Sequence, residues 1–433
     1  MPSQQLISPN IFAEFSRLLP HCWQRNRGTL RPAHVLYAIM VMTVSGTHGY
    51  RRVLDYLKRT VGEQFGWLTT PFPSSLSEAR AKLTPAQCRE AFHQIRLRSS
   101  FVQSAHHRSF AGFRLVAVDM TTIALPVSKA IFEEFQGPID CRRKPSPAPQ
   151  ATLTALWDIS SNTPLDWRLE KCYASERFAA YDMIQALGPN DLLLADRGYP
   201  SRRMFLEIIG RDAKFIIRVP LGTRGGFREI RDFGLDDTRT DEEIMLHEDR
   251  KRSGEPTLKV RVVKMTLAHG EVAVFATNLF GQHDFPSDLI CRAYTYRWDL
   301  ETAFREMKVW HGLEQFHAKT PEGIHQEVAA LMIFMVLTAE MDHQAKKVHA
   351  SGIMIEEVEK GSEIRFNRKV IAESVVYLMV ASANGPAAIQ EEYDRCMREI
   401  WKFRQKVRPG RSFPRVAKSP NAKWKRTTFN TKK

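Results

Sequence analysis

The amino-acid sequence predicts an α/β protein in which a mixed sheet lies between two helical regions. Residues 1–110 carry helical patterns, and helical patterns return after about residue 287. Between them, from Phe113 to about residue 220, three strand-like runs are followed by a strand and helix alternation. Consecutive strands followed by such an alternation are typical of a mixed α/β sheet.

The N-terminal region contains two well-marked helices. Residues 30–44 are almost wholly apolar, which predicts a buried helix. Residues 49–62 are amphipathic, with four apolar residues on one face: Val53, Leu54, Leu57 and Val61. Helix start signals follow at Ser75 or Ser77 and at Thr84. These residues fit a helical DNA-binding module and an all-helical packing domain equally well.

The central region resolves into seven elements. The expected order is strand, strand, strand, helix, strand, helix and strand, at 113–125, 151–160, 164–172, 175–187, 191–196, 201–212 and 214–220. We expect a loop over residues 127–149, because Lys-Pro-Ser-Pro-Ala-Pro interrupts any regular element there. Charged loops and three strand patterns at 221–285 indicate a β-rich insertion, and one long helix is expected from Ser287 to Leu313.

Two further helices are expected beyond the insertion, one opening at Thr320 and one over residues 367–383. The chain thus divides into four parts. They are a helical N-terminal domain (1–110), a core with its insertion (111–349), a C-terminal helical region (350–400) and a tail (401–433). The apolar runs at 33–46 and 328–339 are too short to span a bilayer.

Positive charge is concentrated at the C-terminal end. The net charge is +15, and residues 401–433 hold 12 of the 63 basic residues and no acidic one. The rest of the chain is therefore nearly neutral. A cationic tail favours a polyanionic partner, with nucleic acid preferred over a membrane surface, although a solvated tail has the same composition. Six cysteines without close spacing and no signal-peptide pattern indicate a cytoplasmic protein.

Three carboxylates stand out by their positions. Asp119 and Asp196 end two strand patterns, and Glu301 lies within the long helix. Each alone has an ordinary explanation as a cap, turn or solvated residue. Together they form an oxygen cage suited to divalent cations, and Mg²⁺ prefers carboxylates combined with water and substrate phosphates. A pair of Mg²⁺ ions is expected, with Mn²⁺ as a substitute; two such ions serve phosphodiester chemistry.

The helix that carries Glu301 is unusual on one face. Tyr294, Arg297, Glu301 and Lys308 fall within about 60° of one another at about 100° per residue. A solvated face with an ion pair between Arg297 and Glu301 would be the simpler explanation. A separate apolar stripe already serves packing, so the polar face is free to meet DNA, with cations on phosphates and Glu301 on metal.

These motifs resemble the bacterial DDE transposases of the insertion-sequence-four family, whose fold is ribonuclease H-like. The resemblance rests on Ala-Val-Asp-Met-Thr-Thr around Asp119, Leu-Ala-Asp-Arg-Gly-Tyr around Asp196, and Tyr-x2-Arg-x3-Glu-x6-Lys from Tyr294 to Lys308. It implies that Asp119, Asp196 and Glu301 are catalytic metal ligands. It also implies that Tyr294, Arg297 and Lys308 contact DNA.

The resemblance implies a function as well. A family member binds the terminal inverted repeats of its element, cleaves phosphodiester bonds with metal-activated water and joins the 3′-hydroxyl ends to target DNA. A homodimer is expected in the synaptic complex, and the protein would associate with the bacterial nucleoid. A non-catalytic DNA-binding regulator and a ribonuclease H-like nuclease are the alternatives; intact carboxylates argue against the first.

One feature departs from the family. Studied relatives hold a flipped base on a tryptophan of the insertion during a hairpin step, and residues 200–285 contain no tryptophan here. Other aromatic residues could provide the stacking surface: Phe227, Phe233, Phe275 or Trp298. The hairpin route is therefore left open.

Overall fold

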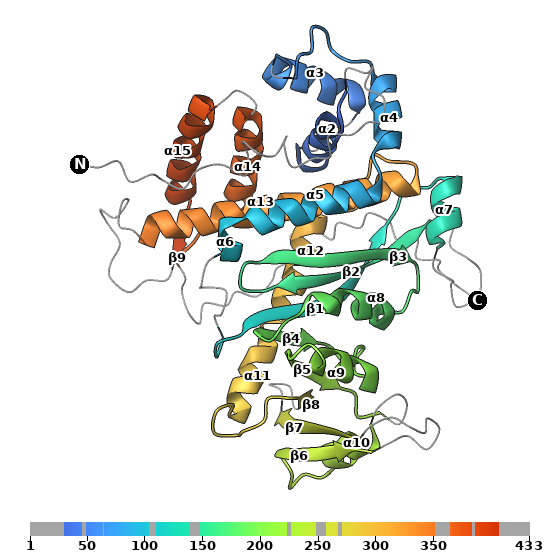
Figure 1. Cartoon of the computed structure of the whole chain (residues 1–433), viewed down its shortest axis with the longest axis vertical. Helices are drawn as coiled ribbons and strands as arrows, with labels where there is room; N and C mark the ends of the chain where they lie inside the picture. Colours follow the sequence, from blue (N-terminus) through green and yellow to red (C-terminus); the bar gives the residue numbers. More distant parts are fainter. Residues whose placement is uncertain are drawn as a thin grey trace, which may run out of the picture.

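The computed structural model places an eight-stranded sheet at the centre of the chain, with helices above it and on both faces (Figure 1). The residues described are 30–45, 49–63, 65–103, 110–137, 148–222, 227–247, 257–266, 271–350, 364–382 and 386–406. Most of the basic tail predicted at 401–433 lies outside these residues. The strand order is β3-β2-β1-β4-β5-β8-β7-β6.

The first five strands form the mixed sheet that the sequence predicts. They are β1 (Arg114–Ala124), β2 (Gln150–Asp158), β3 (Thr163–Lys171), β4 (Asp191–Ala195) and β5 (Lys214–Val219). Strands β1, β2 and β3 pair antiparallel, whereas β4 runs parallel to both β1 and β5. This arrangement confirms the ribonuclease H-like mixed sheet, and helices α8 (Glu176–Met183), followed by the 3₁₀ turn η2 (Ile184–Ala186), and α9 (Arg202–Ile209) connect its later strands.

The β-rich segment extends this sheet. The added strands are β6 (Asp241–Leu246), β7 (Leu258–Thr266) and β8 (Val272–Thr277). Strand β7 pairs antiparallel with both β6 and β8, and β8 pairs antiparallel with β5. The expectation of charged loops before β6 was wrong in part. Residues Arg228–Leu235 form helix α10, because Ile230 and Phe233 bury one face of it against the sheet.

Two further details differ from the sequence prediction. Helix α7 (Lys129–Phe135) occupies the start of the expected loop; Ser128 caps it by accepting from the backbone of Ile131. Helix α4 (Pro73–Lys82) begins before Ser75 and has no side-chain cap. By contrast, α5 (Pro85–Arg98) begins as expected, with Thr84 and Gln87 forming a reciprocal capping box.

The long helix expected from Ser287 to Leu313 is broken. Helix α11 (Ser287–Thr295) and helix α12 (Trp298–Val309) are separated by Tyr296 and Arg297. Backbone amides of both separating residues donate to carbonyls three positions earlier, Ala293 and Tyr294. Such tighter turns offset the axis of α12 from that of α11 without reversing the chain.

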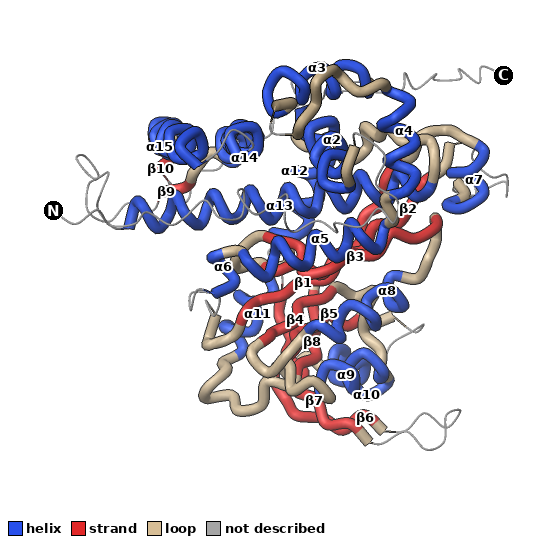
Figure 2. Tube along the Cα trace, turned by 45° about the horizontal axis from the view of Figure 1, so that its top comes forward, coloured by secondary structure: helices blue, strands red, loops and turns tan. Residues whose placement is uncertain are grey.

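The helices outside the sheet gather on α13 (Pro321–Ala350), a 30-residue helix. Figure 2 shows α5 lying alongside it, and α2 (Pro32–Ser45) also packs against it. The remaining helices are α3 (Tyr50–Val61), α6 (Ser100–Gln103), α14 (Arg368–Ser382) and α15 (Pro386–Lys402), and the short strands β9 (Ile364–Arg365) and β10 (Gln405–Lys406) pair antiparallel. The four apolar residues predicted for one face of α3 are buried.

Helix α13 is apolar enough, over Pro321–Val348, to cross a membrane by length and composition alone. However, 83% of its most apolar window is buried inside the protein. Its apolar residues join a core that also includes the N-terminal helices, α12 and one face of the sheet. A second core lies on the other face, beneath α8, α9 and α10. Helix α13 is therefore a scaffold for the N-terminal helices in this structure.

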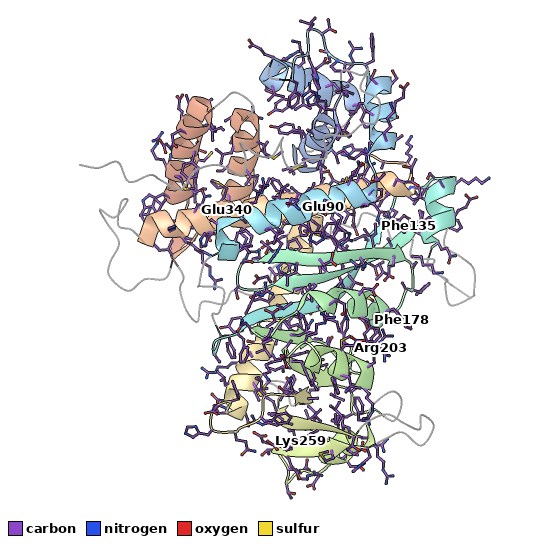
Figure 3. All side chains as sticks on the ribbon, in the orientation of Figure 1. Glu90, Phe135, Phe178, Arg203, Lys259 and Glu340 are labelled. Atoms are coloured by element: carbon purple, nitrogen blue, oxygen red, sulfur yellow. The ribbon has the colours of Figure 1, made fainter. Side chains whose placement is uncertain are left out.

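Buried polar contacts attach those helices to α13. Arg80 on α4 donates to Glu327 at 2.7 Å, to Gln326 at 2.7 Å and to the carbonyl of Gly323 at 2.9 Å. Ser100 donates to Glu340, which is labelled on α13 in Figure 3, from its backbone at 2.8 Å and from its hydroxyl at 2.6 Å. These contacts hold two N-terminal helices at separate points along α13.

Replacing Arg80 by methionine should lower the stability of the protein by about 3–5 kcal/mol, because Glu327 would become an unpaired buried carboxylate. Burial raises the pKa of Glu327, but hydrogen bonds from His317 and the charge of Arg80 outweigh it, so the pKa lies below its ordinary 4.5. The stabilisation is thus present above that value and is lost as the pH falls through the lowered pKa. Thermal unfolding at several pH values measures both effects.

The control is Arg51→Met, on the exposed side of α3, where the arginine side chain is 80% exposed. That change should shift stability by less than about 0.5 kcal/mol. The double variant Arg80→Met, Glu327→Leu should recover part of the loss. Equal destabilisation by the two arginine changes would contradict a special role of the buried pair.

Candidate active site

The sheet register brings two of the predicted carboxylates together. Val118 of β1 is paired with Ala195 of β4 in parallel register. Asp119 and Asp196 are the next residues and are therefore neighbours. Asp196 directly follows the end of β4, whereas β1 continues to Ala124, so the expectation that Asp119 ends its strand was wrong; it lies in the part of β1 that extends beyond β4 and pairs there with β2. Each is partly buried, and each accepts a hydrogen bond from the following backbone amide, Met120 at 2.8 Å and Arg197 at 2.6 Å.

The third carboxylate comes from the helix that crosses this edge. Glu301 lies in the first turn of α12, and its side chain is 33% exposed. Helix α12 packs its apolar residues Leu300, Ala303, Phe304 and Met307 into the core, which leaves Glu301 facing the strands. The structure therefore brings all three sequence-predicted carboxylates to one place.

Arg297 links two of these carboxylates. Its guanidinium donates to Asp119 Oδ2 at 2.9 Å and to Glu301 Oε1 at 2.7 Å. The side chain is only 5% exposed, and its Nε is buried without a hydrogen-bond partner among the described residues. Although burial lowers the pKa of Arg297, Tyr294, Asp119 and Glu301 raise it above its ordinary value, so the guanidinium remains charged.

The two other residues of the signature also face this edge. The hydroxyl of Tyr294 donates to Asp196 Oδ1 at 3.4 Å, and its ring packs 4.6 Å from that of Phe275. Lys308 donates to the carbonyl of Thr122 in β1 at 2.6 Å and lies 3.7 Å from Glu314. The side chains of Tyr294, Arg297, Glu301 and Lys308 thus all face β1 and β4, as their spacing predicts. They do so even though the helix is broken at Tyr296 and Arg297.

Burial, more than the neighbouring charges, alters the titration of Asp119. Burial raises its pKa to about 6, and the carboxylates of Glu301 and Asp196 raise it as well. The Met120 amide and the Arg297 guanidinium lower it without cancelling that rise. A carboxyl group with this pKa would be stabilised in its ionised form by an additional cation.

Sequence reasoning missed a fourth carboxylate near this edge. Glu176, in the first turn of α8, lies against the Cα of Gly198, two residues after Asp196. Burial raises the pKa of Glu176 and Asp196 raises it further, against the effects of Tyr199 and Arg177. Tyr199 is fully buried and its hydroxyl faces Glu176. An acid directly after the N-cap position of Ser175 was the only sequence signal, and it is common to many helices.

The aromatic residues considered for base stacking differ in access. Phe233 and Phe275 are almost completely buried in the core, and Phe227 is partly buried against Phe205 at 5.3 Å. The two buried rings cannot offer a face to a base, which corrects that part of the sequence prediction. Trp298 is 58% exposed and lies beside Arg297, 5.1 Å from ring centroid to guanidinium carbon.

The chemistry of the donor set fits divalent cations, since it supplies three carboxylates at one edge. As they stand, no three His, Cys, Asp or Glu side chains among the described residues are close enough to hold an ion. The Arg297 guanidinium bridges Asp119 and Glu301 in this arrangement. Ion binding would therefore require these side chains to shift relative to one another.

Comparison with known proteins agrees with this geometry. The family model described as the transposase DDE domain matches residues 111–337, which include all three carboxylates. The chain belongs to the DDE transposases. It is also 24% identical, over 363 residues, to transposase InsG for insertion sequence element IS4 of Escherichia coli (strain K12), covering 80% of this chain and 76% of that protein. The predicted insertion-sequence-four family is thereby confirmed.

A solved structure is similar to this transposase at low identity. It is a piggyBac transposase synaptic complex with hairpin DNA, with 10% sequence identity and a TM-score of 0.47, covering 94% of this chain and 87% of that one. DDE transposases as a family generally use divalent metal ions, and the carboxylates described above are the residues of this transposase suited to hold them.

Substituting Gly198 by alanine should displace Glu176. An added Cβ would lie 2.7 Å from Cδ of Glu176 and would clash with its Oε1. Because the obstacle is the end of a flexible side chain, we expect the variant to fold with a loss of about 1–3 kcal/mol. In Glu176→Ala protein the same substitution should cost less, with a coupling of about 0.5–3 kcal/mol in a double-mutant cycle of unfolding.

Gly188→Ala is the matched control, because a Cβ there meets nothing within 4 Å. It should be nearly neutral in both backgrounds. If the effects of Gly198→Ala and Glu176→Ala were simply additive, the two residues would not be in contact in solution.

Proposed function

We propose that this transposase binds the terminal inverted repeats of its insertion sequence, cleaves phosphodiester bonds there by hydrolysis, and joins the resulting 3′-hydroxyl ends to target DNA. The observation that supports this most is the meeting of Asp119, Asp196 and Glu301 at one sheet edge, beside the cations Arg297 and Lys308. A non-catalytic regulator would have no physical need for that grouping of buried charge.

Asp119, Asp196 and Glu301 would hold the divalent ions, for which Mg²⁺ is the expected metal and Mn²⁺ a substitute. Such ions lower the pKa of an attacking water and stabilise the leaving oxygen of a phosphodiester. The carboxylates of Asp119 and Asp196 accept hydrogen bonds from the backbone amides of Met120, within β1, and Arg197, just after β4, so their orientation is set before substrate arrives. Arg297 neutralises part of their charge in the free protein.

On binding DNA, Arg297 and Lys308 would exchange protein acceptors for phosphate oxygens. Arg297 already directs both terminal nitrogens of its planar guanidinium at the carboxylates. Lys308 is bonded to a carbonyl of β1 and is 27% exposed, so it can be reached by a backbone phosphate. Tyr294 would keep Asp196 oriented and contact the DNA strand from the side on which Arg297 and Lys308 lie.

Two element ends must be processed together, so we propose a homodimer in the synaptic complex. The N-terminal helices up to residue 110 and the basic tail from residue 401 are proposed to contribute further DNA contacts. Association with the bacterial nucleoid in the cytoplasm would follow from such DNA binding. The test of the whole proposal is incubation of purified protein with duplexes carrying the element ends and Mg²⁺, with nicked, hairpin and joined products separated on a denaturing gel.

Asp119→Asn, Asp196→Asn and Glu301→Gln should each reduce cleavage at least about a hundredfold, because each removes charge that the phosphoryl-transfer transition state requires. Binding of the element ends should change little, since most affinity comes from cations on phosphates. Gel-shift and single-turnover cleavage assays measure the two quantities. Asp232→Asn, a 53% exposed acid on α10, is the control. If any one variant cleaved at the parental rate, the residue substituted in it would not belong to the active site.

Lys308→Ala and Arg297→Lys should slow single-turnover cleavage at saturating DNA more than they weaken initial binding. Arg297→Lys should not restore the parental rate, because a lysine lacks the planar fork that contacts two acceptors. Arg292→Ala, at a 69% exposed arginine on α11, is the matched control and should leave the rate unchanged. Unchanged cleavage with uniformly weaker binding would place both side chains outside the reacting centre.

A further inference from the structure

A polar cavity opens beside α8 and α9, on the face of the sheet opposite α12. Its volume is about 430 Å³, and it is lined by three arginines, two serines and two aromatic residues. Both helices begin at the edge that carries the catalytic carboxylates: α9 starts shortly after Asp196, and α8 follows β3, which is parallel to β1. None of the lining residues belongs to the signature that the sequence resemblance identifies.

Fixed contacts hold the inner wall of this cavity. The hydroxyls of Tyr181 and Ser201 are hydrogen-bonded at 2.8 Å, which joins α8 to the start of α9. The guanidinium carbon of Arg203 lies 4.2 Å from the centroid of the Tyr181 ring. Arg202 is buried and donates to backbone carbonyls at the end of β6. The wall is therefore organised before any ligand binds.

The outer wall exposes groups that a ligand can reach. Phe178 is 67% exposed and Arg177 is also exposed. The Ser175 side chain makes no cap hydrogen bond at the start of α8. Phe178 and Arg203 project from the two helices on the same side of the molecule (Figure 3).

The charges around the cavity are mostly positive. The nearest acid on α9, Glu207, lies 3.6 Å from Arg203, in a pair whose arginine is 60% exposed. Of the two acids on α8, Glu176 is turned toward Gly198 and Asp196, and Asp182 is exposed and does not line the cavity. Two exposed arginines beside an exposed phenylalanine match the two parts of a nucleotide, because guanidinium groups bind phosphate and aromatic rings stack on bases.

The distance from the reacting centre suits one DNA strand. Ser201 follows Asp196 by five residues, so the two lie no more than about 19 Å apart. Stacked DNA advances about 3.4 Å per nucleotide along a strand. A strand that reaches the carboxylates can therefore also reach the cavity within a few nucleotides.

We propose that this cavity binds a nucleotide of single-stranded DNA a few positions from the cleaved phosphodiester, with its phosphate on Arg177 and Arg203 and its base against Phe178. The inference rests on the proposed function for the identity of the strand. It adds a contact site on the α8 and α9 side of the carboxylate edge, opposite the side of Arg297 and Lys308.

The test uses full-length protein in Ca²⁺, with element-end duplexes that carry single-stranded extensions at the cleavage position. Phe178→Ala should weaken binding of the extended DNA by about five- to a hundredfold, as expected for loss of one stacking contact. Binding of a blunt duplex should be nearly unchanged. Phe178→Trp should retain the affinity, and because residue 178 is mostly exposed, neither change should alter thermal unfolding.

Arg177→Ala should flatten the slope of log affinity against log salt for the extended DNA by about 0.7. Arg228→Ala, at an 83% exposed arginine on α10, is the matched control and should leave the slope unchanged. In addition, 5-iodouracil placed at successive positions of the extension should cross-link to Phe178 or Tyr181 from one or two positions only.

The inference would be overturned if Phe178→Ala bound extended DNA as tightly as the parental protein and the cross-links fell elsewhere. Normal cleavage and joining in the same experiments would leave the proposed function standing. If the parental protein failed to cleave its ends, the proposed function would fail instead. Salt titration and cross-linking with single-stranded DNA of random sequence would still decide whether the cavity binds a nucleotide.

Discussion

The parallel pairing of β1 with β4 is the constraint on which the site depends. It makes Asp119 and Asp196 neighbours at one sheet edge, although 77 positions separate them in the sequence. A shift of one residue in this register would turn one carboxylate to the opposite face. Apolar residues on both faces of β4 are completely buried, and the two cores therefore fix the register that the chemistry needs.

Charge balance is the second requirement at this edge. Several carboxylates lie together in partly buried positions, and Arg297 is the cation that contacts two of them. The break between α11 and α12 places Arg297 at the start of α12, one turn before Glu301. Backbone geometry and electrostatics thus act on the same residue: the turn positions the guanidinium, and the guanidinium stabilises carboxylates that would otherwise repel one another.

Helix α13 relates the site to the rest of the molecule. The N-terminal helices attach to it through Arg80 and Ser100, while α12 shares its core with α13 and with one face of the sheet. The opposite face carries α8 and α9, whose starts surround Glu176 and the arginine-lined cavity. The sheet edge is consequently flanked on two sides by basic side chains held on separate cores, an arrangement suited to a polyanionic strand.

The sequence by itself determined the strand and helix order, the buried face of α3, the capping of α5 and the three carboxylates with their signature, because local spacing and side-chain chemistry are sufficient for these. It did not reveal α7 or α10, whose few apolar residues are stabilised by packing rather than by strong propensity. Only the tertiary structure decided that the helix breaks before Trp298, that Arg297 bridges Asp119 and Glu301, that Phe233 and Phe275 are buried, and that Glu176 lies against Gly198. Apart from the helix break, each of these depends on contacts between segments distant in the sequence, which no local pattern encodes.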